Sequence, residues 1–172
     1  MPVHFEPAEM EIRRHQVSKR LSELGLDGLL MFKQESMYYL TGYDTFGFGM
    51  FQCLIIDGSG HTVLLTRLPD LRQAQFTSDI QDIRLWHDTE DVNPALELRG
   101  LLDDLGYRNK TLGIEFDSYG LKAHYWRLLE PQLDGFCRLV DASTLVDQFR
   151  RVKSPTEIEY IRRAAELSDD AW

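Results

Sequence analysis

The sequence has few of the residues that cross-link a chain or hold a metal ion. Two cysteines, Cys53 and Cys137, occur in 172 residues, and each lies within an apolar run, where a cysteine is typically a small buried side chain. The histidines share no helix face, and no CxxC or HxxxH spacing is present. We therefore expect no metal ligand in this chain. Its length is enough to bury a core without a disulfide or a metal ion.

Long apolar runs and an excess of positive charge are also missing. No stretch of about 18 apolar residues is present, so we expect no membrane-spanning helix. Residues 1–14 lack the apolar region of a secretory signal. The chain has 19 Lys and Arg residues against 28 Asp and Glu residues, a formal net charge of −9, which disfavours binding to nucleic acid. These absences predict a cytoplasmic protein.

Composition and length indicate a folded domain. Hydrophobic residues make up 43% of the chain and charged residues 27%, which is the balance of a globular protein rather than a disordered one. The length fits one domain, or one domain with part of another.

Apolar patterns predict an α/β fold. Strands are expected at residues 29–32, 50–56, 61–66, 83–87, 111–116 and 136–140. Helices are expected at residues 9–24, 36–40, 69–76, 94–105, 118–129 (ending before Pro131) and 144–149. Alternation in the second half predicts parallel pairing, whereas Asp57-Gly58-Ser59-Gly60 between two strands predicts a hairpin. The sheet is therefore expected to be mixed and roughly six-stranded, with helices on both faces.

The first helix is predicted to be amphipathic. Its expected buried stripe consists of Ile12, Val17, Leu21 and Leu24. Arg13, Arg14 and other basic residues fall outside this stripe and are expected to face solvent.

The last helix has a clear beginning and no clear ending. Ser154-Pro155-Thr156-Glu157 combines an N-cap serine, a first-turn proline and a glutamate at the third position. An apolar stripe follows at Ile158, Ile161, Ala165 and Leu167. The helix then reaches Trp172 without a Gly, Asn or Pro to end it. We expect that the chain was cut from a longer protein; the alternative is a natural C-terminus that frays.

No catalytic residue stands out. Gly47-Phe48-Gly49 begins like a dinucleotide-binding fingerprint, but Gln52 replaces the third glycine and a strand follows instead of a helix. Glu115 and Asp117 follow a predicted strand and are within reach of a cleft. The stronger interpretation is that they neutralise the N-terminus of a helix.

The segment from Tyr43 to Gly49 is unusual because it holds three aromatic residues and two glycines before a strand. Aromatic side chains on a loop often form a contact surface. They also serve to plug the edge of a sheet, and the sequence does not separate the two interpretations.

Three segments together resemble the N-terminal domain of the creatinase/prolidase family, the pita-bread metallohydrolases. The first is Met37-Tyr38-Tyr39-Leu40-Thr41-Gly42-Tyr43, which is similar to the family's Tyr-Leu-Thr/Ser-Gly-aromatic segment. The second is the hairpin that follows. The third and most specific runs from Leu145 through Arg151-Val152-Lys153-Ser154-Pro155-Thr156-Glu157-Ile158, which is similar to the family's Arg-x-x-Lys-Ser-Pro-x-Glu-Ile junction.

The resemblance implies a ribonuclease-H-like creatinase N-terminal domain at residues 1–150. Residues 151–172 would then be the junction and the start of the first helix of a catalytic domain outside this sequence. The implied parent is a homodimeric Xaa-Pro peptidase-like hydrolase for a small peptide or amide substrate. Its two divalent metal ions (manganese, cobalt or zinc) would be held by the catalytic domain, and this chain alone would be inactive.

The resemblance also implies which residues lie near the substrate. Creatinase-like members carry a Phe-Gly-Arg stretch near the partner subunit's active site, and the matching positions here are Phe48-Gly49-Met50. Losing the arginine removes a bidentate partner for a carboxylate, which argues against creatine as the substrate. The expected substrate-adjacent residues are Tyr43, Asp44, Phe46, Phe48 and Met50. The alternatives are a creatinase-like or other small-molecule amidohydrolase, and a non-catalytic binding or scaffold domain.

Overall fold

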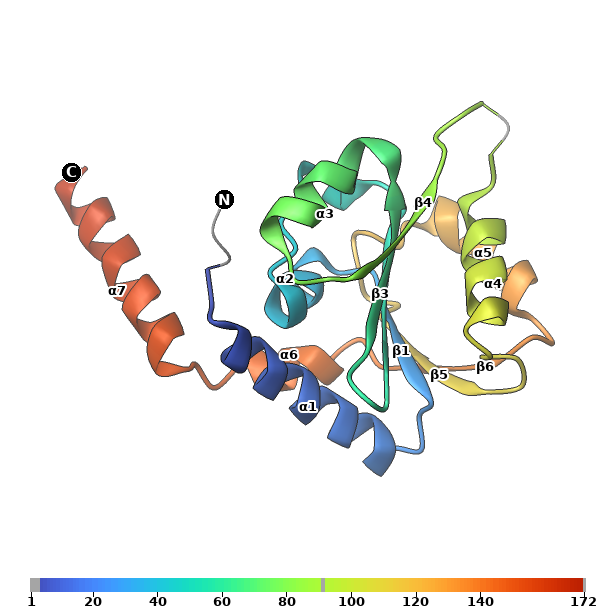
Figure 1. Cartoon of the computed structure of the whole chain (residues 1–172), viewed down its shortest axis with the longest axis horizontal. Coiled ribbons are helices and arrows are strands. Elements are labelled where there is room, and N and C mark those ends of the chain that lie inside the picture. The colour runs from blue at the N-terminus through green and yellow to red at the C-terminus, as the bar shows by residue number, and fades with distance from the viewer. Residues whose placement is uncertain (1–3, 91, 172) are drawn as a thin grey trace.

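The computed structural model describes residues 4–90 and 92–171, in which a mixed sheet lies between two layers of helices (Figure 1). The six strands are β1 (Gly28–Met31), β2 (Cys53–Asp57), β3 (Thr62–Arg67), β4 (Asp82–Trp86), β5 (Thr111–Ile114) and β6 (Arg138–Asp141). Their order in the sheet is β4-β3-β2-β1-β5-β6. The β1–β2 and β2–β3 pairs are antiparallel and the other three pairs are parallel. The predicted α/β fold with a six-stranded mixed sheet is confirmed.

The helices form the two layers and one projection. They are α1 (Pro7–Glu23), α2 (Gln34–Thr41), α3 (Leu71–Thr77), α4 (Pro94–Asp104), α5 (Ala123–Leu133), α6 (Leu145–Arg150) and α7 (Pro155–Asp170), with short 3-10 helices η1 (Phe46–Gly49) and η2 (Leu68–Asp70). Helices α4 and α5 cover one face of the sheet, while α1, α2, α3 and α6 cover the other. None of the helices in the described part of the chain is long and apolar enough to cross a membrane.

The central strands are buried on both faces, which explains their unbroken apolar sequences. In β1, Leu30 packs under α4 and α5, while Leu29 and Met31 point to the opposite layer. Successive side chains of a strand point to opposite faces, so each central strand contributes to two cores.

The predicted hairpin joins β2 to β3. The backbone N–H of Asp57 donates to the carbonyl of His61 at 3.1 Å, and the Asp57 side chain accepts a hydrogen bond from the N–H of Ser59 at 2.8 Å. Gly60 has φ +89°, a conformation that glycine adopts without steric cost. The turn therefore depends on the glycine that the sequence analysis identified.

Two predicted elements differ from the structure by three or more residues. The strand expected at 50–56 begins at Cys53, where its pairing with β3 begins, opposite Leu65. The helix expected at 118–129 is α5, which begins at Ala123 and continues through Pro131. Pro131 lies in the last turn of α5, where its missing N–H removes only one hydrogen bond from the helix.

The buried face of α1 also differs from the prediction. Val17 and Leu21 are buried as expected, but Ile12 is 59% exposed and Leu24 is 48% exposed. Arg13, expected to face solvent, is only 3% exposed. A charged side chain is buried at this depth only when partners neutralise and bond it. The partners of Arg13 are Glu9 on the same helix and Tyr39 and Glu157 from other segments.

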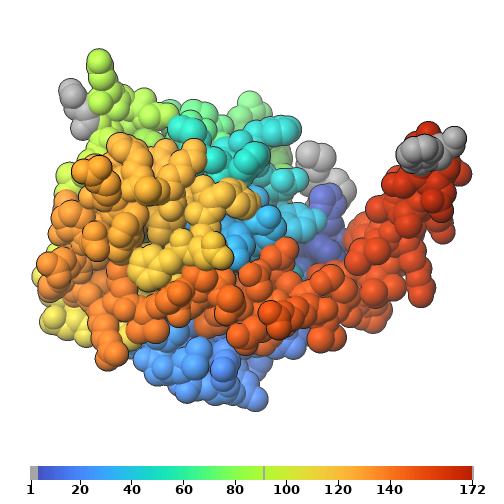
Figure 2. All heavy atoms as spheres, turned by 180° about the vertical axis from the view of Figure 1, so that it is seen from behind, coloured from blue at the N-terminus to red at the C-terminus, as the bar shows by residue number. Residues whose placement is uncertain are grey.

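The last helix, α7, leaves the body of the domain. Its predicted capping box is present: the Ser154 hydroxyl accepts from the N–H of Glu157 at 3.1 Å, and the Glu157 carboxylate accepts from the N–H of Ser154 at 2.8 Å. No residue of α7 is buried. Figure 2 shows the helix standing clear of the other elements. Its expected apolar stripe is therefore uncovered, with Ile161 51% exposed and Leu167 71% exposed.

Candidate functional site

The main hollow of the surface is a groove of about 1160 Å³ between α2, η1, α3 and the beginning of α7. We call it the aromatic groove, because seven aromatic side chains line it: Phe5, Tyr38, Tyr39, Phe46, Phe48, Phe76 and Tyr119. Its walls come from segments far apart in the sequence, so the fold rather than any single motif creates it.

The wall formed by η1 is held firmly to the domain. The Thr45 hydroxyl caps η1 by accepting from the N–H of Gly47 at 2.9 Å, and the Gln52 side chain donates to the Gly47 carbonyl at 2.9 Å. A Cβ at Gly47 would lie 2.5 Å from the Asp70 carboxylate, so a side chain is sterically excluded there. This segment is therefore a fixed support for its aromatic residues.

The aromatic residues of this segment differ in their exposure to solvent. Tyr43 is fully buried, and its hydroxyl donates to Gln52 Oε1 at 2.8 Å. Phe46 is 92% exposed, and Phe48 is half exposed with its ring edge-on to Tyr119, the ring centroids being 5.9 Å apart. Tyr43 therefore belongs to the core, while the two phenylalanines line the aromatic groove.

Three of the five predicted substrate-adjacent residues line the aromatic groove: Asp44, Phe46 and Phe48. The side chain of Tyr43 lies in the core behind the groove wall. Met50 is half-buried and lies outside the groove lining. The structure thus brings together the first three and separates the other two from them.

The opposite walls add groups that the sequence analysis did not single out. On α3, the Arg72 guanidinium lies over the Phe76 ring, 5.7 Å from its centroid, and both residues line the groove. Tyr119 donates to the Glu35 carboxylate on α2 at 2.8 Å. Burial, followed by the bond and charge of Glu35, raises the pKa of Tyr119 to about 12. Its hydroxyl is therefore a neutral donor at physiological pH.

Glu115 holds the α2 wall in place from behind. Its carboxylate is fully buried at the end of β5 and accepts from the N–H groups of Phe32 and Lys33 at 3.0 and 2.9 Å and from the Ser36 hydroxyl. Glu115 was expected to neutralise the helix that follows it, but that helix, α5, begins only at Ala123. Glu115 instead bonds the backbone immediately before α2. Burial raises the pKa of Glu115 to about 7, against the lowering effect of the Ser36 hydrogen bond.

Neither a metal-binding group nor a thiol of lowered pKa is found among the described residues. Among residues 4–90 and 92–171, no group of three or more His, Cys, Asp or Glu side chains is placed to hold a metal ion. Burial raises the pKa of both thiols, Cys53 and Cys137, which makes them poor nucleophiles. What the groove offers is fixed aromatic surface with separate acidic and basic groups, which suits binding.

Comparison with known proteins gives a consistent result. A family model described as the creatinase/prolidase N-terminal domain matches residues 13–152. The chain is 31% identical over 170 residues to an ectoine hydrolase of Halomonas elongata, which covers 95% of this chain and 42% of that protein. It spans about two-fifths of the length of the curated relatives that it matches, 42% and 44%.

Solved structures agree on the fold. A prolidase of Thermococcus sibiricus superposes with a TM-score of 0.77 at 20% identity, over 94% of this chain and 42% of that one. The N-terminal domain of a cytoplasmic peptidase of Mycobacterium tuberculosis superposes with a TM-score of 0.60 at 21% identity, over 80% of this chain and 97% of that one. The predicted resemblance, in sequence segments and in fold, is confirmed.

Proposed function

The chain belongs to the creatinase/prolidase N-terminal domain family, and from that premise we propose that it is the accessory domain of a two-domain metallohydrolase. In this proposal residues 1–150 form the accessory domain and residues 151–172 lead into a catalytic domain through α7. The observation that carries the proposal is the aromatic groove, a fixed and exposed binding surface without catalytic groups beside an uncovered helix.

The groove is proposed to form part of the wall of the substrate pocket. Phe46 and Phe48 are exposed aromatic side chains on a rigid support, and such side chains contribute contact area at little entropic cost. Asp44 lies beside them. Tyr43 and Met50 act in this proposal only indirectly, by supporting the segment that carries the two phenylalanines.

The reaction itself is assigned to the catalytic domain. Two divalent metal ions (manganese, cobalt or zinc) would be held there, since the described residues of this chain offer no metal-binding group. The full protein is proposed to be a cytoplasmic homodimer, in which the exposed aromatic residues are covered, because soluble proteins rarely leave large apolar patches open. A solved relative that is named a cytoplasmic peptidase supports the location.

The proposed reaction is hydrolysis of an Xaa-Pro dipeptide. The second candidate is hydrolysis of a small amidine, cyclic amide or modified amino acid, and the 31% identity to an ectoine hydrolase favours it. Substrate profiling of the full-length protein with Xaa-Pro dipeptides and with ectoine separates the two candidates.

Two measurements test the accessory role. The purified 172-residue chain is expected to hydrolyse no Xaa-Pro dipeptide and no ectoine with manganese, cobalt or zinc, and metal-dependent turnover by this chain would refute the proposal. In the full-length protein, Phe48→Ala is expected to change KM or kcat several-fold with little change in melting temperature.

A matched control is available on the opposite face of the domain. Leu96 on α4 is 53% exposed, close to the 50% of Phe48, and lies outside the aromatic groove. Leu96→Ala is expected to leave both kinetic constants unchanged. If Phe48→Ala lowered stability and left the kinetics unchanged, its role would be to plug the domain surface.

A further inference from the structure

The beginning of α7 is joined to α1 by a partly buried cluster of side chains. We call this cluster the clasp and define it as Phe5, Glu9, Arg13, Ser154 and Glu157. At its centre, the Arg13 guanidinium lies 4.1 Å from the centroid of the Phe5 ring and 4.4 Å from that of the Tyr39 ring. A guanidinium between two aromatic faces is held in one plane, which orients its donors.

Hydrogen bonds link the oriented guanidinium of Arg13 to the N-cap residue of α7. Arg13 donates to Glu9 Oε1 at 2.6 Å and to the Tyr39 carbonyl at 3.0 Å, and lies 3.4 Å from Glu157 Oε1. The Ser154 hydroxyl donates to the same Glu9 oxygen at 2.7 Å. Glu9 thus bridges the arginine of α1 and the first residue of the α7 capping box.

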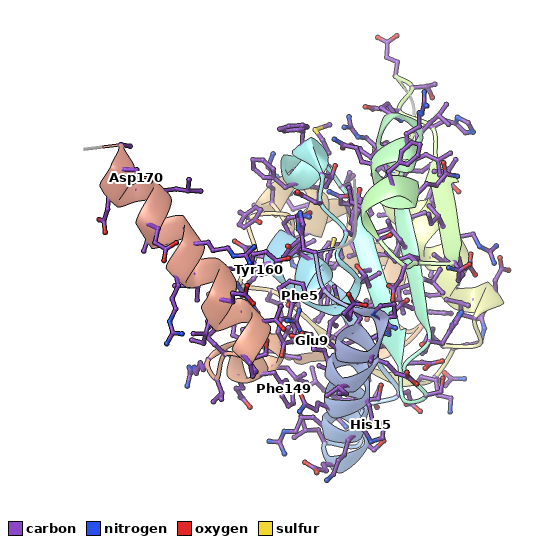
Figure 3. The ribbon with its side chains drawn as sticks, turned by 60° about the vertical axis from the view of Figure 1, so that its left-hand side comes forward. Phe5, Glu9, His15, Phe149, Tyr160 and Asp170 are labelled. Carbon is purple, nitrogen blue, oxygen red and sulfur yellow. The ribbon has the colours of Figure 1, made fainter. Side chains whose placement is uncertain are left out.

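One turn further along α7, Tyr160 makes a second contact between this helix and the segment before α1. The Tyr160 hydroxyl donates to the carbonyl of His4 at 2.8 Å. The Tyr160 ring meets the Phe5 ring edge-on with centroids 5.7 Å apart. Figure 3 shows Phe5 and Tyr160 between the two helices, with Glu9 beside them.

Beyond Tyr160, α7 has no other support. Residues 161–170 are all exposed, so the contacts that set the direction of the helix lie at its beginning, in the clasp and at Tyr160. Phe5, Arg13 and Glu157 of the clasp also line the aromatic groove. The direction of α7 and the shape of the groove at its α7 end therefore depend on the same side chains.

We propose that Arg13 is a positioning residue that fixes the direction in which α7 leaves the domain and thereby sets the width of the aromatic groove beside it. The connection is a rigid arm and not a swivelling linker. This inference does not depend on the identity of the substrate or on any catalytic activity.

The test is a distance distribution across the groove. Spin labels are placed on cysteines introduced at Glu166 on α7 and Gln75 on α3, which are both exposed. Cys137 is replaced by serine, and Cys53 is left in place because it is fully buried. Pulsed electron paramagnetic resonance is expected to give one narrow distribution, and adding Arg13→Met is expected to broaden it at least twofold. Methionine keeps an apolar side chain against the Phe5 and Tyr39 rings and removes the guanidinium group.

The control lies next to Arg13 on the same helix. Arg14 donates to the Asp79 carboxylate at 2.7 Å and to the Leu40 carbonyl at 3.0 Å, without contacting α7. Arg14→Met is therefore expected to leave the distance distribution narrow, although it removes a comparable set of bonds.

A second variant guards against failure of Arg13→Met to fold. Ser154→Ala combined with Tyr160→Phe removes two hydrogen bonds that hold α7 without touching the core, since Tyr160 is 41% exposed. This double variant is expected to broaden the distribution while the melting temperature stays unchanged. A narrow distribution with Arg13→Met would overturn the proposal, as would a starting protein already as broad as that variant. If Arg13→Met does not fold, a narrow distribution in the double variant overturns it instead.

Discussion

Helices α5 and α7 are both amphipathic, yet they differ completely in what they bury. In α5, Leu129 and Leu133 are 0% and 1% exposed within the core over the sheet. In α7, no residue is buried, and Ile158 and Ile161 are 37% and 51% exposed. An apolar stripe shows that a helix requires a covering surface. Which surface covers it is decided by the rest of the fold, and for α7 this domain provides none.

The same contrast separates the two helical layers. The layer of α4 and α5 closes over one core, in which Leu98, Leu102 and Leu129 are fully buried. The opposite layer buries a second core but leaves Phe46 and Phe76 on its outer surface, 92% and 58% exposed. The second layer therefore combines a packed core with an exposed aromatic surface.

The largest expected effect is on the packed helix. Leu129→Ala removes a fully buried side chain from α5 and leaves a cavity, so we expect the free energy of unfolding to fall by about 2–5 kcal/mol. Urea denaturation followed by circular dichroism measures it. The matched change on α7, Ile161→Ala, is expected to cost less than about 0.5 kcal/mol in this chain. Equal losses at the two positions would show that α7 is packed in solution.

The second effect concerns Glu115, which holds α2 in the layer formed by α1, α2, α3 and α6. Burial raises its pKa to about 7 in the folded chain, above the value of an unfolded glutamate, so the folded state binds the proton more tightly. The stabilisation from this proton is fully present below about pH 4.5 and is lost as the pH rises through about 7. The free energy of unfolding is expected to fall by up to about 3 kcal/mol across that range.

Urea denaturation at pH values from 5 to 8 measures this slope. Glu115→Gln keeps a carbonyl acceptor for the N–H groups of Phe32 and Lys33 and cannot ionise, so its stability is expected to be nearly independent of pH in this range. If the unaltered chain were equally stable at pH 5 and pH 8, Glu115 would be ionised throughout.

The smallest effect compares two helix caps. The Asn93 side chain caps α4 by accepting from the N–H of Ala95 at 3.0 Å, and Asn93→Ala is expected to lower global stability by about 1 kcal/mol. Ser154→Ala removes a similar bond from α7, and its effect is expected to appear only as faster amide hydrogen exchange within α7. A global loss of stability from Ser154→Ala would mean that α7 unfolds together with the core.

The sheet was predictable because its signal is local. Apolar patterns predicted all six strands, and the Asp-Gly turn predicted the hairpin that makes the sheet mixed. The ends of elements were less predictable. Pro131 is tolerated where it costs a single hydrogen bond, and β2 begins only at Cys53, where pairing with β3 starts. These outcomes depend on the position within an element, which composition does not report.

The candidate site was predictable only in part, because its determinants are not local. Tyr43 and Phe46 belong to one aromatic segment, yet one is fully buried and the other is 92% exposed. Arg13 looked like a surface residue, since its partners Phe5, Tyr39 and Glu157 come from three other places in the chain. The groove has the same origin, as its walls meet only after folding.

Glu115 has one more consequence for what the domain can bind. Strands β1 and β5 are parallel neighbours, and the helices that follow them, α2 and α5, lie on opposite faces of the sheet. Open α/β sheets commonly bind cofactors at such a switch point, where amide N–H groups face an anion. Here the protein's own carboxylate accepts those N–H groups. The backbone groups of this usual cofactor crevice are thus satisfied by the domain's own side chain.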